Sequence, residues 1–178
     1  MRMNRDSIEW VAVHEAAHAI ALYRQIDSAG SVSIVPNRQA ETLGHFQDDG
    51  SSCSTDPKDV EAHIVSCYAG GHAQRLADPS TGADGCDSDD NEAASLLAQW
   101  SWQNREQELR AKSAVLVEKH WTEIEAVARE LLILRSLDAT EVELIADRTA
   151  GDLEANVAVY REGFGTQLDA WRKSMEPS

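Results

Sequence analysis

Residues 7–20, SIEWVAVHEAAHAI, decide how the first part of the chain folds. Their apolar positions recur with the period of an α-helix. On a helix, residues four apart stand one turn apart on the same face, so His14 and His18 can reach one ion while Glu15 leans toward the same side. This HEAAH arrangement is typical of a zinc hydrolase, which makes the two histidines candidate ligands and the glutamate a candidate acid–base group.

Length and composition indicate one ordinary domain. The chain has 178 residues, of which 42% are hydrophobic, enough to bury a core without disulfides. No apolar run approaches the roughly 20 residues that a membrane-spanning helix needs. The N-terminal residues are charged and include no secretory signal, so we expect a cytoplasmic protein.

The charge balance and the cysteines exclude several classes of function. Sixteen basic residues against 31 acidic ones give a net charge of −15, which repels phosphate backbones and anionic membranes. We therefore expect neither a nucleic-acid partner nor a membrane partner. Cys53, Cys67 and Cys86 are odd in number and lack a CxxC pair, so we interpret them as reduced thiols and not as a disulfide framework or a structural zinc site.

The remaining pattern predicts an α+β fold, mainly helical, with a small β-sheet beside the HEAAH helix. That helix is expected from about residue 8 to residue 23, with Asp6 as its N-cap. Two strands are expected over 31–36 and 42–47. Further helices are expected over 57–77, 88–103, 106–135 and 140–149, with one or two more beyond residue 151.

Local signals mark how these helices begin and how two of them meet. Asp56-Pro57 is a typical helix start, Ser88 is a natural N-cap, and the run from Thr140 to Glu143 has the form of a capping box. Ala69-Gly70-Gly71 lowers helix propensity, and glycine at such positions often marks the close approach of another backbone. The helix over 57–77 is therefore expected to cross the HEAAH helix tightly.

A catalytic zinc ion normally has three protein ligands, so the HEAAH box needs a partner elsewhere in the chain. The metzincin extension is absent, because Ala21 and Arg24 stand where glycine and the third histidine would be. Glu61 and His63 are conceivable ligands without a supporting pattern. The acidic cluster over residues 87–90, at the start of a predicted helix, is the better source, because a helix N-terminus preorganises a short carboxylate.

A series of short motifs runs in order along most of the chain: HEAAH-Ala-Ile, VSIVP at 32–36, TLG at 42–44, YAGGHAQ at 68–74, STGA at 80–83, SDD at 88–90, AA at 93–94 and IEAVARELL at 124–132. In order and spacing, these motifs resemble the peptidase domain of the FtsH family, the membrane-anchored ATP-dependent zinc proteases. The resemblance covers about residues 8–148, which we interpret as a zinc peptidase-like domain, with 149–178 as a helical C-terminal extension of it. It implies zinc bound by His14, His18 and Asp89, with Glu15 as the catalytic acid.

The chain also departs from the family. Gln74 stands where an acidic residue is usual, and the sequence contains no ATPase module and no transmembrane segment. The expected substrate is therefore an unfolded protein or a short peptide, delivered where necessary by a separate ATPase or other partner. The family's hexamer is not carried over, and the oligomeric state stays open.

Two hypotheses follow. The leading one is a zinc metallopeptidase in which Asp89, and neither Asp87 nor Asp90, is the third ligand, because residues in a helical turn point about 100° apart and Ser88 at the cap would select one of them. Glu15 would act as general base and acid. An exposed edge of the sheet could hold an extended peptide by strand addition. The competing hypothesis is a catalytically weak or inactive peptidase-like module with a binding or regulatory role.

Overall fold

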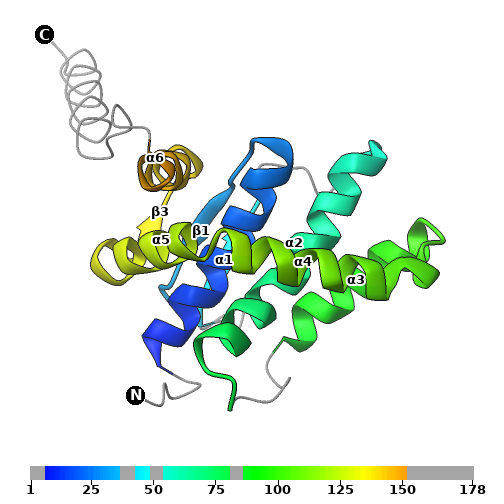
Figure 1. Cartoon of the computed structure of the whole chain (residues 1–178), viewed down its shortest axis with the longest axis horizontal. Coiled ribbons are helices and arrows are strands. Elements are labelled where there is room, and N and C mark those ends of the chain that lie inside the picture. The colour runs from blue at the N-terminus through cyan, green and yellow to red at the C-terminus, as the bar shows by residue number, and fades with distance from the viewer. Residues whose placement is uncertain (1–6, 37–42, 49–53, 81–85, 152–178) are drawn as a thin grey trace, which may run out of the picture.

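A computed structural model describes residues 7–36, 43–48, 54–80 and 86–151 (Figure 1). Within these ranges the chain is mainly helical with a three-stranded antiparallel sheet, which confirms the mainly helical α+β class. The expected extension over 149–178 lies almost wholly outside the described residues. The elements are α1 (Ile8–Ile26), β1 (Ser31–Ser33), β2 (His45–Gln47), α2 (Pro57–Ala77), α3 (Asp87–Gln99), the 3₁₀ turn η2 (Gln103–Arg105), α4 (Glu106–Lys119), α5 (Trp121–Leu134), β3 (Ser136–Leu137) and α6 (Ala139–Ala150).

Helix α1 is the centre of the molecule and packs against α2 on one side and α5 on another (Figure 1). Its hydroxyl cap is Ser7, which accepts a hydrogen bond from the backbone N–H of Trp10, whereas the expected cap Asp6 lies outside the described residues. The helix runs three residues further than expected and ends at Asp27, whose backbone is left-handed. Many of its buried residues are alanines, and such small side chains let neighbouring helices approach closely.

The apolar side chains form two cores. The larger core lies between α1, β1, β3, α5 and α6, and the smaller one lies between α2, α3 and α4. Helix α2 begins and ends where expected, with Asp56 capping its first turn and Pro57 at its start. Because α2 contacts both α1 and α3, it joins the two cores and brings the N-terminal turn of α3 toward the HEAAH face of α1.

The sheet has the order β2-β1-β3, with both pairs antiparallel. The two expected strands are present but shorter than predicted, and β3 was not predicted at all. Beyond Ser33 the chain leaves the ladder, although the backbone N–H of Ile34 still donates to the carbonyl of Arg135 at 2.9 Å. Among the described strands β2 pairs only with β1, so its other side is an edge.

Three helix predictions were wrong in detail. Helix α3 ends at Gln99 instead of residue 103, and Cys86, not Ser88, occupies its N-cap position, without a side-chain capping bond. The capping box of α6 is formed by Asp138 with Glu141 and not by Thr140, because Asp138 lies outside the helix and can turn its carboxylate back onto the first-turn N–H groups.

The single long helix expected over 106–135 is two helices that lie roughly end to end (Figure 1). His120 breaks it, with φ −107° and ψ 20°, and caps both halves. Nδ1 of His120 lies 2.9 Å from Oε1 of Glu123, and the other carboxylate oxygen of Glu123 accepts from Nε of Arg24 on α1 at 2.7 Å. This tertiary pairing stabilises the break. None of the described helices is long and apolar enough to cross a membrane.

Candidate metal centre and active site

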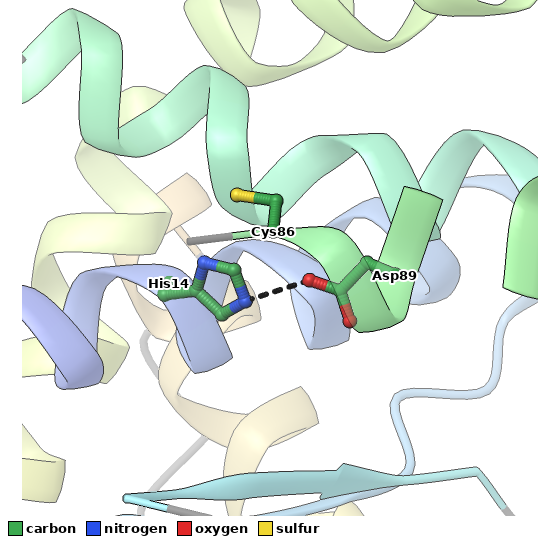
Figure 2. A group of neighbouring side chains, drawn as sticks. All are labelled: His14, Cys86 and Asp89. Carbon is green, nitrogen blue, oxygen red and sulfur yellow. Dashed lines mark ion pairs between the residues drawn. The ribbon is translucent and has the colours of Figure 1, made fainter. Parts of the chain in front are cut away.

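Three polar side chains from two helices converge beside the α1–α2 crossing. His14 and His18 stand one turn apart on α1, and their Nε2 atoms are 2.9 Å apart. Oδ2 of Asp89, in the first turn of α3, lies 3.0 Å from Nε2 of His14 (Figure 2). The same oxygen lies 3.6 Å from Nε2 of His18. The structure thus brings together the three residues that the sequence and the family resemblance point to as metal ligands.

These distances suit a tetrahedral ion. Ligand atoms held about 2.0–2.1 Å from a tetrahedral zinc are separated by about 3.3 Å. The three separations between His14, His18 and Asp89 are 2.9, 3.0 and 3.6 Å, which bracket that value. Two imidazole nitrogens and one carboxylate oxygen are also ligands that zinc prefers. The residues present therefore fit a zinc ion.

The tautomer of His18 also fits a bound cation. Its Nδ1 lies 2.7 Å from the backbone carbonyl of Ser66, so Nδ1 carries the proton and donates it to that oxygen. In the neutral ring Nε2 then holds a lone pair directed at His14 and Asp89, where only a proton or a cation can relieve the repulsion. A backbone carbonyl that orients a metal-binding histidine in this way is a common outer-shell partner. The buried Nδ1 of His14 has no hydrogen-bond partner among the described residues.

The local field favours positive charge at this point. Burial alone would lower the pKa of His18, but the hydrogen bond and charge of Asp89, with a contribution from Glu15, outweigh it and raise the pKa to about 9. Burial opposes ionisation of Asp89, yet its hydrogen bonds to His14 and His18 and the charges of these rings hold its pKa far below the usual range. A cation between these groups is thus stabilised electrostatically.

Gly70 on α2 explains how two helices can enclose this group. A Cβ atom on Gly70 would lie 2.5 Å from Cε1 of His14 and 2.7 Å from Nε2 of His18. The position therefore requires glycine because the imidazole rings occupy the space of a side chain. This confirms the close α1–α2 approach that the Ala69-Gly70-Gly71 run predicted.

Glu15 is buried, with 7% of its surface exposed. Desolvation is the largest influence on its carboxyl and raises its pKa, although the charges of His18 and His14 act in the opposite direction. Its Oε1 lies against the turn before β2, where a Cβ on Gly44 would be only 2.8 Å away. A carboxyl group with a raised pKa is suited to accept and return a proton near neutral pH.

A cavity of about 310 Å³ opens onto this group. Its lining includes His14, Glu15 and His18 from α1, Asp89 from α3, and strand β2 with Asp48. A larger cavity, of about 590 Å³, lies elsewhere, is lined mostly by basic and apolar side chains, and contains Glu61. The smaller cavity is the chemically relevant one, because His14, His18, Asp89 and the candidate base Glu15 all line it. Its remaining lining residues are Gly44, His45, Phe46, Gln47, His63, Ser66, Cys67, Ser88 and Glu92.

The other acidic candidates are directed elsewhere. Glu61 binds Arg105 and Lys112, both at 2.8 Å, and is not near the histidine pair. Asp90 pairs with Arg110 at 3.0 Å, and Asp87 is exposed. Asp89 therefore faces His14 without the help of the Ser88 cap that the sequence argument invoked, and that part of the argument was wrong.

Sequence reasoning gave too little weight to Cys86. Its Sγ and the ligand atoms of His14 and Asp89 all lie within 4.8 Å of one another (Figure 2). The thiol also contacts Oε1 of Gln74 at 3.9 Å, and burial together with nearby carboxylates raises its pKa to about 11. Cys86 precedes Asp89 by only three residues, but from the sequence we interpreted it as one of three reduced thiols without a role.

Comparison with known proteins adds no relative to these observations. The chain matches no model of a known protein family, and no curated protein matches it.

Proposed function

We propose that the protein is a zinc metallopeptidase with a peptidase domain of the FtsH type, acting on unfolded polypeptides or short peptides. The observation that carries the proposal is the triangle formed by Nε2 of His14, Nε2 of His18 and Oδ2 of Asp89, with the buried carboxyl of Glu15 beside it. Three protein ligands next to a general base are what a hydrolytic zinc site requires, since the fourth position stays open.

The roles of the side chains follow from their positions. His14, His18 and Asp89 would hold the ion, and Ser66 would keep His18 in the ligating tautomer. Zinc bound there would supply a water of lowered pKa and would polarise the carbonyl of the scissile bond. Glu15 would accept the proton of the attacking water at its carboxylate and return it to the leaving amine.

The cavity also suggests how a peptide would bind. The edge strand β2 lines the cavity and pairs only with β1 among the described strands. An extended peptide could add to this edge by backbone hydrogen bonds, with its scissile bond beside Glu15. Such binding needs an extended chain, which favours unfolded protein or short peptide as the substrate, supplied where necessary by a separate unfolding partner.

Zinc content and turnover of matched variants test the proposal. Wild-type protein should retain zinc after dialysis and cleave an unfolded casein-type substrate without nucleotide. Glu15→Gln should retain the ion but lose cleavage by roughly 100-fold or more, the scale of general acid–base catalysis. Equal cleavage by wild type and Glu15→Gln would refute the proposed function.

Cys86 favours the competing hypothesis of a binding or regulatory module. If its thiolate filled the fourth position, the site would be closed and structural, because catalytic zinc needs an exchangeable place. Cys86→Ser separates the two cases. Unchanged zinc affinity and cleavage support the peptidase, whereas a large loss of affinity in an inactive wild type supports the module.

A further inference from the structure

A second group of ligand-type side chains lies in the same cavity, outside the proposed catalytic triangle. His63 and Cys67 stand one turn apart on α2, and Glu92 stands one turn beyond Asp89 on α3. One ligand atom from each of these three residues can be chosen so that all lie within 4.8 Å of one another. The spacing of His63 and Cys67 repeats on α2 the four-residue spacing of His14 and His18 on α1.

We infer that His63, Cys67 and Glu92 form a second metal site, for a borderline divalent cation such as Zn²⁺. One imidazole nitrogen, one thiolate and one carboxylate are a donor set that zinc accepts and that hard cations such as Mg²⁺ do not prefer. The carboxylate of Asp48 lies at the same place, with Oδ2 3.5 Å from Nδ1 of His63.

The hydrogen bonding of His63 supports a cation there. The residue is 5% exposed, and Nε2 lies 2.9 Å from Oε1 of Glu92. Its buried Nδ1 makes no hydrogen bond to any described residue, although Oδ2 of Asp48 lies 3.5 Å away. A neutral imidazole has one N–H, so it can satisfy Glu92 or face Asp48 with a proton, but not both. A cation bound among these groups would neutralise both carboxylates. It would also bind the thiol of Cys67, which the hydrogen bonds of His63 do not involve.

The position of the second site defines its role. It would bridge α2 to α3 one turn from Asp89, and its ligand Cys67 directly follows Ser66, whose carbonyl orients His18. An ion at this bridge would hold the first turn of α3 against α2 and so keep Asp89 beside the histidines. This role is one of positioning and does not depend on peptide hydrolysis. Because Glu92 is half exposed, with 54% of its side chain accessible, the ion could enter from solvent.

Metal titration of the full chain tests the inference. Apo protein should bind about two equivalents of Zn²⁺ or Co²⁺ per chain. When Co²⁺ is the metal, a thiolate-to-cobalt charge-transfer band should grow as one of the two equivalents binds. The band should vanish in Cys67→Ser and persist in Cys86→Ser, the matched control at the buried thiol beside His14 and Asp89. It should also persist in His14→Ala, where only the second site remains.

Glu92→Gln is a second test that should not disturb folding, because this side chain lies at the rim of the cavity. Weaker metal binding in this variant could therefore not be attributed to misfolding. It should weaken binding of one equivalent by roughly 10- to 100-fold and leave the other unchanged. A wild-type stoichiometry of one without a band that depends on Cys67, or a band that follows Cys86 instead of Cys67, would overturn the second site. A band that follows Cys86 would also favour the closed, structural form of the first site, whereas the proposed peptidase is tested separately by Glu15→Gln.

Discussion

Replacing Gly70 by alanine tests the geometry of the candidate site most directly. The new Cβ would lie 2.5 Å from Cε1 and 2.6 Å from Nδ1 of His14, and 2.7 Å from Nε2 of His18, whereas ordinary contacts begin at 3.4 Å. The His14 ring would therefore have to move by about 0.9 Å, more than the roughly 0.5 Å within which a functional group must be held. His18 has little freedom to yield, because its Nδ1 is bonded to the carbonyl of Ser66 at 2.7 Å.

The expected result is a zinc affinity lower by at least 10- to 100-fold, the scale on which disturbed outer-shell partners act. Isothermal titration with Zn²⁺ in a competing chelator buffer would measure it. Gly71→Ala is the matched control on the same helix, because its Cβ would meet the thiol of Cys86, at 2.8 Å, and neither histidine ring.

Measurements of stability distinguish a local change at the metal site from unfolding of the whole protein. Alanine gains up to about 1 kcal/mol of helix propensity over glycine in both variants. Thermal unfolding in excess chelator should therefore leave Gly71→Ala at least as stable as wild type, while steric displacement offsets the gain in Gly70→Ala. Wild-type zinc affinity in a folded Gly70→Ala protein would refute the close approach of α2 to the two histidines.

Three further predictions concern the fold. Leu131→Ala removes a fully buried side chain of the larger core and should lower the free energy of unfolding by about 2–5 kcal/mol in urea denaturation. Arg24→Met should cost about 2 kcal/mol by the same assay, because Glu123 loses its bond of 2.7 Å; a neutral result would show that this network is dispensable. Burial and two arginines lower the pKa of His72 from 6.5 to about 4, so the folded state loses stability as pH falls through that interval, and His72→Gln should show a shallower decline.

The parts of the fold that were predictable from the sequence depend on local chemistry. The start of α2 follows from Asp56 and Pro57, which satisfy and preorganise a first turn with no help from other elements. The break at His120 could not be predicted in this way, because both halves have helical periodicity and Glu123, which pairs with His120, is held in turn by Arg24 of the distant helix α1. Strand β3 is two residues long and exists only because β1 pairs with it.

In the candidate site, too, some residues could be predicted from local sequence, whereas others are placed by contacts between distant segments. His14 and His18 are one turn apart on any helix, so their shared face was predictable. The choice of Asp89 came from the family resemblance and from a Ser88 cap that does not form; what places Asp89 is the packing of α3 against α2, which no spacing rule contains.

The cavity is therefore best understood as a product of the α1–α2 crossing. Gly70 leaves room on α2 for both imidazole rings, and Ser66, one turn earlier, supplies the carbonyl that orients His18. The same face of α2 then continues to His63 and Cys67, beside Glu92 on α3. One helix thus makes room for His14 and His18, orients His18, and carries His63 and Cys67 beside Glu92. We therefore expect substitutions on α2 to disturb both proposed metal sites, whereas substitutions on the HEAAH helix should disturb only the first.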